Sequence, residues 1–302
     1  MKKQLIVIAG PTASGKTSLA VELAKQFKCP IISADSRQFY KEMSIGTAKP
    51  TETEMDGIKH YFINSHSINS PLSAGKYEQE SLEIIQKEFL THDQLILVGG
   101  SGMYIDAVVF GTDKIPHSKS LREKWNALYK NNGIRYLQKE LKLKDPSYFK
   151  TVDKNNHVRL IRALEVIELT GETYSSLRKN TRSKRTFNTY YFVINHSREV
   201  LYERINSRVD TMISMGLINE VKDLIQFREL QPLNTVGYKE IFDYLDGKST
   251  KQEAIELIKQ NTRRYAKRQI TWFKRHDEVK WIDFNNINSL IDTVNTQINT
   301  NQ

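Results

Sequence analysis

Short, almost unbroken apolar runs recur along this chain of 302 residues. They occupy residues 4–9, 30–33, 94–98 and 189–194. A run of this length without polar alternation is typical of a strand that is buried on both faces. Amphipathic helical patterns lie between the runs, for example at 18–25 and 76–90. Strands that alternate with helices predict an α/β fold with a doubly wound parallel sheet.

The pattern becomes helical after Gly111. Residues 112–189 show helical periodicity, as at 159–167, and no strand-like run until 189–194. We therefore predict an α/β core of residues 1–111 and 190–302, with 112–189 as a mostly helical insertion domain. Further helices are expected at about 199–228, 237–245 and 250–275, followed by a weak last helix and a frayed, Asn-rich tail after Phe284.

The turn after the first strand carries a phosphate-binding motif. It reads Gly10, Pro11, Thr12, Ala13, Ser14, Gly15, Lys16 and Thr17, and it matches G-x-x-x-x-G-K-[ST] between a strand and a helix. Backbone N–H groups and the helix N-terminus would face phosphate oxygens, Lys16 adds a positive charge, and the Thr17 hydroxyl suits a magnesium ion. A chance glycine turn is disfavoured by the flanking strand and helix. We expect the chain to bind a di- or triphosphate.

Polar residues also follow the second and third strands. Asp35 lies where ligands bind in open α/β sheets, so its carboxylate suits a general base or a magnesium ligand, and a helix N-cap is the structural alternative. The third strand ends in Gly99, Gly100, Ser101 and Gly102. These glycines predict a backbone that approaches a ligand closely and presents the Ser101 hydroxyl to it. ATPases and GTPases usually carry an acidic residue at this place, so an ATPase is disfavoured.

The composition adds an excess of positive charge, because 45 Lys and Arg against 35 Asp and Glu give +10. Basic residues gather without acids at 178–185 and 262–275, which favours nucleic-acid binding over a solvated charged face. Arg204 and Arg208, one helical turn apart, form a candidate phosphate clamp, with surface pairing to Glu203 or Asp210 as the alternative. In the last long helix we expect a basic face of Arg263, Arg264, Lys267, Arg268 and Thr271 and an inward face of Ala266, Ile270 and Phe273.

Two absences narrow the class of protein. No run of 18 or more apolar residues occurs and the first strand begins almost at once, so we expect neither a membrane span nor a cleaved signal peptide. The single cysteine, Cys29, has no partner for an internal disulfide and is expected to be a small buried hydrophobic residue. A cytoplasmic monomer is our expectation.

Eight motifs in order resemble the bacterial tRNA dimethylallyltransferase (tRNA isopentenyltransferase) family, collinear over roughly residues 4–275. They are GPTASGKT at 10–17, DSRQFY at 35–40, GTAKP at 46–50, VGGSGMY at 98–104, RLIRALEV at 159–166, the segment 208–217, VGYKE at 236–240 and RRYAKRQITWF at 263–273. The resemblance implies a P-loop α/β core with a helical insertion. It also implies transfer of a dimethylallyl group from dimethylallyl diphosphate to N6 of adenosine-37 in tRNA, with release of diphosphate.

The resemblance implies roles for individual residues as well. The phosphate loop would hold the donor's diphosphate, and Lys16, magnesium on Thr17 and Arg208 would neutralise the leaving group. Asp35 matches the family's proposed general base, and Ser101 would lie beside an adenine that has left the helical stack. Contacts with the tRNA anticodon stem-loop are implied for the insertion domain and for Asp35, Ser36, Arg37, Gln38, Ser101, Arg159, Arg162, Arg263, Arg264, Lys267 and Arg268.

The chain departs from the family pattern in three places. Ser101 stands where threonine is usual, but the hydroxyl is kept. Lys59-His60-Tyr61 replaces a pair of histidines, and Lys76 follows Ala74-Gly75 where an aspartate is usual. We therefore assign no role to His60 and no catalytic role to residues 73–77.

Three other functions stay open on the sequence. An adenylate isopentenyltransferase shares the core but modifies a free nucleotide, and the basic clusters and the insertion disfavour it. A small-molecule P-loop kinase would explain neither the basic helix nor the glycines after the third strand. A nucleic-acid-binding ATP switch would need an acidic residue where Gly99 or Gly100 stands.

Overall fold

The computed structural model describes residues 3–179, 181–284 and 286–299. The chain divides into a larger unit, Met1–Phe110 with Lys184–Gln302, and a smaller one, Gly111–Ser183. Residues 184–189, which we expected in the insertion, lie in the larger unit. Arg185 shows why, because its guanidinium donates to the backbone oxygens of Ala107 and Val108 and pairs with Glu78.

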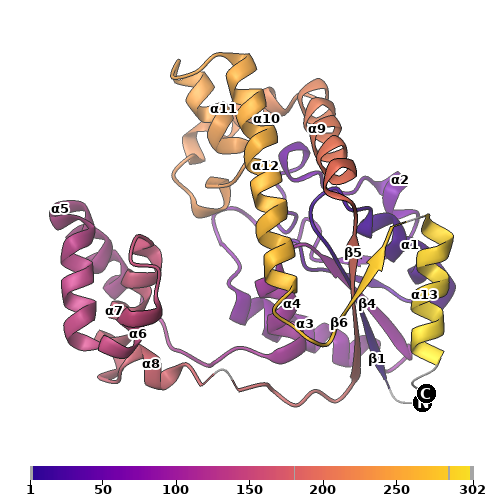
Figure 1. The fold of residues 1–302 in the computed structure, drawn as a ribbon, viewed down its shortest axis with the longest axis horizontal. Helices are drawn as coiled ribbons and strands as arrows, with labels where there is room; N and C mark the ends of the chain where they lie inside the picture. The colour runs from indigo at the N-terminus through magenta and orange to yellow at the C-terminus, as the bar shows by residue number, and fades with distance from the viewer. Residues whose placement is uncertain (1–2, 180, 285, 300–302) are drawn as a thin grey trace. The chain divides into compact units, whose positions relative to one another are not determined.

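The larger unit is built on a six-stranded parallel sheet of order β3-β2-β4-β1-β5-β6 (Figure 1). The strands are β1 (Gln4–Ala9), β2 (Ile31–Ser33), β3 (His60–Tyr61), β4 (Gln94–Gly99), β5 (Asn188–Asn195) and β6 (Val279–Asp283). β1 lies between β4 and β5, and every residue in it is buried. The predicted α/β fold is confirmed, and the apolar runs lack alternation because both faces of the sheet are covered.

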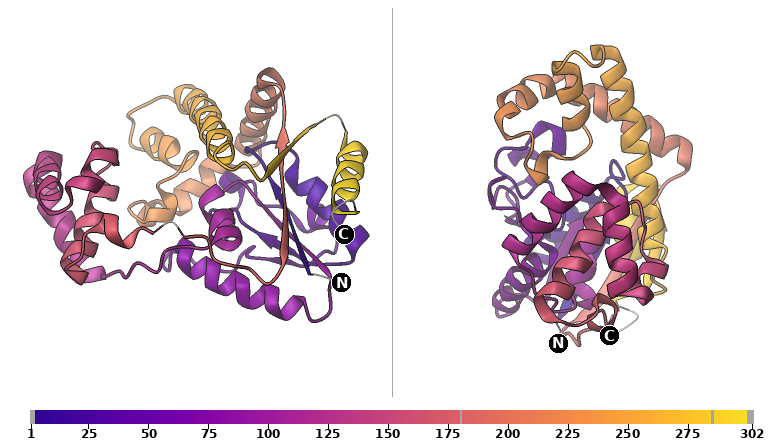
Figure 2. Two further views of the ribbon diagram at one scale, coloured as in Figure 1. Left: turned by 60° about the horizontal axis from the view of Figure 1, so that its bottom comes forward. Right: turned by 90° about the vertical axis from the view of Figure 1, so that its left-hand side faces the viewer.

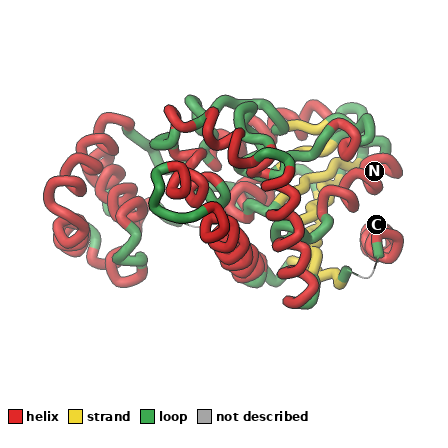
Figure 3. The backbone as a smooth tube through the Cα atoms, turned by 90° about the horizontal axis from the view of Figure 1, so that it is seen from above, coloured by secondary structure: helices red, strands yellow, loops and turns green. Residues whose placement is uncertain are grey.

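Helices cover both faces of this sheet (Figures 1 and 3). α1 (Lys16–Phe27) packs against α13 (Ile287–Asn299) on one face, and α3 (Ala74–Glu88) packs against α4 (Gly102–Phe110) on the other. Cys29 is buried in the core that they share with the strands, as expected. None of the described helices is both long and apolar enough to cross a membrane.

A second group of helices in the larger unit extends beyond the carboxyl ends of the strands (Figure 2). It contains α9 (Arg198–Ser214), α10 (Leu217–Asp223), α11 (Tyr238–Leu245) and α12 (Lys251–Phe273). The larger unit also has four short helices, which are η1 (Ile45–Thr47), α2 (Glu52–Met55), η2 (Ile225–Phe227) and η3 (Gln231–Leu233). The prediction of one helix over about 199–228 was wrong. Gly216, at φ +100°, separates α9 from α10, a backbone conformation that glycine adopts at little cost.

The smaller unit is helical, with α5 (Lys119–Lys144), α6 (Pro146–Thr151), α7 (His157–Thr170) and α8 (Tyr174–Leu177). Trp125, Leu137, Leu141, Leu160 and Leu164 form its own core. A fully buried carboxylate, Glu165, accepts hydrogen bonds from the Ser118 N–H and from the guanidinium groups of Arg122 and Arg162. These bonds tie the start of α5 to α7.

The C-terminal region differs most from the prediction. β3 and β6 were not predicted, because two-residue and five-residue edge strands leave little apolar pattern. The segment after Phe284 was expected to be frayed, but α13 forms there and buries Leu290, Val294 and Ile298. These three residues, four apart, lie on one face of a helix, a pattern that the many asparagines around them obscured.

Candidate active site

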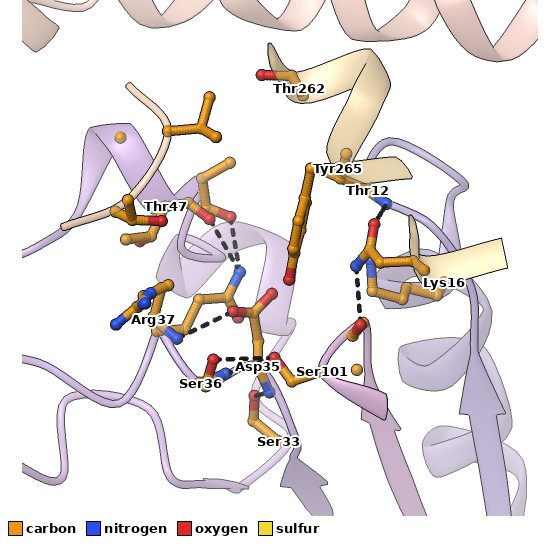
Figure 4. A pocket seen from close by; sticks show the side chains of 18 of the residues that line it. Thr12, Lys16, Ser33, Asp35, Ser36, Arg37, Thr47, Ser101, Thr262 and Tyr265 are labelled. Atoms are coloured by element: carbon orange, nitrogen blue, oxygen red, sulfur yellow. Dashed lines mark hydrogen bonds between the residues drawn. The ribbon is translucent and has the colours of Figure 1, made fainter. Parts of the chain in front are cut away.

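A cavity of about 440 Å³ opens in the larger unit where β1, β2 and β4 end (Figure 4). The phosphate loop, the segments after β2 and β4, η1, α9 and α12 all contribute to its wall. Its polar lining includes Thr12, Lys16, Thr17, Asp35, Ser36, Arg37, Gln38, Ser101, Arg208 and Arg268. The structure thus brings together half of the residues that the sequence marked as candidates, from segments that range from the phosphate loop to α12.

The phosphate loop is held in place by side chains from three distant segments. Thr12 N–H donates to Gln269 Oε1 at 2.9 Å, and Arg204 Nε donates to the backbone oxygen of Ala13 at 2.7 Å. His196 Nε2 lies 2.9 Å from the backbone oxygen of Ser14. Such contacts fix the loop before a ligand arrives, so little ordering remains to be done on binding.

Arg204 and Arg208 do not form the phosphate clamp that their spacing suggested. Arg204 supports the phosphate loop and lies over the ring of Phe284, while Arg208 lines the cavity. The alternative pairing with Asp210 does not occur either, because that carboxylate pairs with Lys259. Of the two arginines, Arg208 remains as the candidate for a ligand.

Lys16 and Arg208 are two half-buried positive charges that line the same cavity. Burial lowers the pKa of Lys16 to about 8, which the charge of Asp35 opposes and that of Arg208 reinforces. Burial also lowers the pKa of Arg208, opposed by Asp35 and Glu54. Arg208 Nη2 donates to the backbone oxygen of Thr47 at 3.4 Å, and its Nε has no hydrogen-bond partner among the described residues. An anion in the cavity would stabilise both cations.

Asp35 and Ser101 face the cavity from neighbouring strand ends (Figure 4). Asp35 Oδ1 accepts from the Arg37 N–H at 3.1 Å, a local turn bond that agrees in part with the capping alternative. Ser101 Oγ accepts from the Ser36 N–H and donates to Ser36 Oγ, both at 3.0 Å. Gln38 is held by its amide, which donates to the backbone oxygens of Thr47 and Ala48.

The glycines at the end of β4 and directly after it make close contacts with neighbouring parts of the protein. A Cβ on Gly99 would overlap the backbone of Ala34 on the neighbouring segment. A Cβ on Gly100 would overlap the amide of Gln269, and one on Gly102 would overlap the ring of Trp272. The glycines therefore admit the β2 segment and α12, and because all three also line the cavity, the close approach of this backbone to a ligand stays a prediction.

Sequence reasoning missed several residues of the cavity, three of them on one face of α12. Tyr265, Gln269 and Trp272 are four and three residues apart and all line the cavity, so the helical spacing within RRYAKRQITWF was the available signal. Burial raises the pKa of the Tyr265 hydroxyl to about 12, and the charge of Asp35 adds to the shift. His60, to which the sequence assigned no role, also lines the cavity, and burial lowers its pKa.

The predicted basic face of α12 is only partly free. Arg264, Lys267, Arg268 and Thr271 are exposed, and Arg268 lies over the ring of Tyr265. Arg263 is half-buried and donates to Asn206 Oδ1 at 2.7 Å. Ala266 and Phe273 are buried on the opposite face, and Ile270 packs beside the small cluster around Leu201.

In the smaller unit, the two arginines proposed for tRNA differ in their surroundings. Arg159 is exposed. Arg162 donates to the backbone oxygens of Ile115 and Pro116 and to Glu165, so its guanidinium is committed to the fold of this unit. The basic run 178–185 belongs partly to this unit, and its Asn180 lies outside the described residues.

Thr17 is the candidate magnesium ligand, and it lines the cavity next to Lys16. Within the described residues, no group of three or more His, Cys, Asp or Glu side chains is arranged to hold a metal ion. One hydroxyl beside a phosphate loop fits magnesium, which takes most of its ligands from water and substrate phosphates.

Comparisons with known proteins agree on one family. A family model described as IPP transferase matches residues 38–276. The tRNA dimethylallyltransferase of Cytophaga hutchinsonii is 46% identical over 282 residues, 93% of each chain. That of Christiangramia forsetii is 45% identical over 302 residues, 99% of this chain and 100% of its own.

Solved structures give the same result. The tRNA isopentenylpyrophosphate transferase of Bacillus halodurans is similar with a TM-score of 0.73 and 37% identity, covering 99% of this chain and 96% of that one. A eukaryotic dimethylallyltransferase acting on tRNA has a TM-score of 0.79 and 27% identity, covering 98% of this chain and 77% of that one. The chain therefore belongs to the tRNA dimethylallyltransferase (IPP transferase) family of tRNA-modifying prenyltransferases.

Proposed function

We propose that this enzyme transfers a dimethylallyl group from dimethylallyl diphosphate to N6 of adenosine-37 in the tRNA anticodon loop and releases diphosphate. The observation that carries the proposal is the pair of half-buried cations, Lys16 and Arg208, that line one cavity beside the carboxylate of Asp35. Two partly desolvated positive charges in one cavity favour an anionic ligand. A diphosphate leaving group is such an anion, and its negative charge grows during the reaction.

The chemistry assigns complementary roles to the two sides of the cavity. N6 attacks C1 of the allyl group, the C1–O bond breaks, and its electron pair leaves with the diphosphate. Lys16 and Arg208 stabilise the charge that accumulates there, and their positions are fixed in advance by the fold. The lone pair of an exocyclic adenine amine is delocalised, so Asp35 accepts the N6 proton as the new C–N bond forms.

Magnesium would be held by Thr17 and the diphosphate, and it would supply further neutralisation of the leaving group. Ser101 would hydrogen-bond the flipped adenine, because its hydroxyl lies beside Asp35 in the same cavity (Figure 4). Ser36, Arg37 and Gln38 would contact the nucleotides on either side.

The tRNA backbone would contact the exposed basic residues of α12, namely Arg264, Lys267 and Arg268, with Arg263 at their edge. Arg159 of the smaller unit would contact the anticodon stem, while Arg162 would support that surface from within. We further propose that the enzyme is cytoplasmic and monomeric, and light scattering on a sizing column would test the monomeric state.

The direct test is incubation with radiolabelled dimethylallyl diphosphate, magnesium and an unmodified tRNA that carries adenosine-37. Label should enter the tRNA, and nuclease digestion should recover it as N6-isopentenyladenosine. The matched control is the same tRNA with guanosine-37, which lacks the N6 amine and should stay unlabelled. Label in free AMP or ATP instead of tRNA would overturn the proposal in favour of an adenylate isopentenyltransferase.

A further inference from the structure

Glu220, in the first turn of α10, binds a segment of backbone that lies far from it in the sequence. Its carboxylate accepts hydrogen bonds from the N–H groups of Ser44, Ile45 and Gly46 at 3.0, 2.7 and 2.9 Å. The Tyr238 hydroxyl donates to the same carboxylate at 2.6 Å. Four donors thus converge on one charged acceptor, and hydrogen bonds of this charge-assisted kind are the strong ones.

These N–H groups begin the short helix η1. The first N–H groups of a helical turn have no partner inside it, and the Ser44 side chain makes no cap here. Glu220 supplies the missing acceptor from another element. Tyr238 can reach it because residue 46 is a glycine, on which a Cβ would lie 2.5 Å from the tyrosine ring.

The other end of η1 lies in the cavity. The backbone oxygen of Thr47 accepts from Arg208 Nη2 at 3.4 Å and from Gln38 Nε2 at 3.2 Å. Among the described residues, this oxygen is the one hydrogen-bond acceptor of the Arg208 guanidinium. Glu220 itself does not line the cavity. The helix η1 therefore connects a carboxylate outside the cavity to a cation inside it.

We propose that Glu220 is a positioning residue, which fixes η1 so that the Thr47 carbonyl orients the Arg208 guanidinium toward the diphosphate of the donor. This proposal rests on the proposed function of Arg208 as a diphosphate-binding group. Glu220 touches no substrate, so its effect passes through Thr47 and Arg208.

The test is Glu220→Gln, a variant of the same size without the charge. Its amide keeps one oxygen acceptor, and its NH₂ group cannot accept a hydrogen bond, so at least one of the three N–H groups loses its partner and η1 is held less firmly. We expect kcat/KM for dimethylallyl diphosphate to fall about 10- to 100-fold, the range that a misplacement of about 1 Å produces. Affinity for tRNA should not change. The variant Glu220→Asp keeps the charge and should recover part of the loss.

Glu253 offers a matched control. It accepts from the N–H and the hydroxyl of Thr250 at 2.7 and 2.9 Å at the start of α12, so it caps a helix in the same way, but it does not line the cavity. Glu253→Gln should leave kcat/KM unchanged. Equal losses in both variants would overturn the proposal, because they would show a general effect on folding.

A double-mutant cycle tests the route through Arg208. If Glu220 acts through this arginine, adding Glu220→Gln to Arg208→Ala should cost little beyond Arg208→Ala alone, whereas fully additive losses would overturn the proposal. Should Glu220→Gln not fold, Tyr238→Phe removes one hydrogen bond from the carboxylate and should give a smaller loss of kcat/KM.

Two outcomes separate this proposal from the proposed function. Absence of transfer by the unaltered enzyme would contradict the proposed function. An active enzyme with an equally active Glu220→Gln variant would contradict only the positioning role of Glu220.

Discussion

Gln269 joins the phosphate loop to the end of a neighbouring strand. Its Oε1 accepts from the Thr12 N–H at 2.9 Å, and its Nε2 donates to the backbone oxygen of Gly100 at 2.8 Å. The side chain is 6% exposed, so both bonds lie in protected surroundings. The helix that carries Gln269 also carries the exposed basic residues Lys267 and Arg268. One amide therefore connects the proposed RNA-binding helix with the loop proposed to bind the donor.

Gln269→Ala should weaken both the fold and donor binding. It leaves a half-buried N–H and a buried carbonyl without their side-chain partner, which costs about 1–3 kcal/mol for a buried group that stays unsatisfied. Urea denaturation should show the lower free energy of unfolding, and KM for dimethylallyl diphosphate should rise. Gln252 is the control, because it lies on the same helix with one bond to Glu256 on the surface. Equal behaviour of the Gln252→Ala variant would contradict this role of Gln269.

The lowered pKa of Lys16 predicts a pH dependence of donor binding. The free enzyme loses this proton near pH 8, so the affinity for dimethylallyl diphosphate, measured without tRNA, should fall as the pH rises from 7 to 9. The same shift has the opposite effect on the unliganded fold. Between about pH 8 and the ordinary lysine pKa of 10.5 the unfolded chain binds more protons, so Lys16 makes stability rise with pH in that window.

Lys16→Arg keeps the positive charge at this position but removes its loss of a proton in this pH range. Arginine stays protonated over this range, so the fall in donor affinity between pH 7 and 9 should disappear even where the affinity itself is lower. Isothermal titration at several pH values measures both variants. A fall that persists unchanged in Lys16→Arg would assign the pH dependence to another group.

Asp35→Asn tests the general base. The amide cannot accept the N6 proton, so the single-turnover rate of transfer should fall about 10²- to 10⁴-fold. Donor affinity should stay the same or increase, because a negative charge beside Lys16 and Arg208 is removed. Rapid-quench measurements with saturating donor and tRNA give the rate. An unchanged rate would exclude Asp35 as the base.

Lys267→Ala tests the RNA-binding surface. Lys267 is exposed, so its contact with a phosphate would release about one counterion and its loss should lower the slope of log K against log salt by about 1. Filter binding of tRNA at several salt concentrations measures the slope. Lys248→Ala is the control, because this lysine pairs with Asp243 and Asp246 and should leave the slope as it is. The same slope for Lys267→Ala and the unaltered enzyme would place the tRNA elsewhere.

The sequence predicted the parts of the site that are local. The phosphate loop is one contiguous motif, and Asp35 and Ser101 follow from the rule that ligands lie at the carboxyl ends of parallel strands. The bond between Gln269 and Thr12 joins residues 257 positions apart, and no pattern in either segment specifies the other. Gly99, Gly100 and Gly102 show a second reason why the sequence could not predict the whole site. They predicted a backbone that something approaches closely, but the protein neighbours that do so, Ala34, Gln269 and Trp272, are set by tertiary packing.

The supports of the phosphate loop also have a consequence for the order in which this protein is made. His196, Arg204 and Gln269 follow their partners in the loop by 182, 191 and 257 residues. β1, which leads into the loop, likewise needs β5 as one of its two neighbours. A nascent chain that ends before these segments carries the complete motif but none of its braces, and contacts of such long range form slowly. We therefore expect the phosphate loop, which is synthesised before the segments that hold it, to be among the last parts of the chain to become able to bind a ligand.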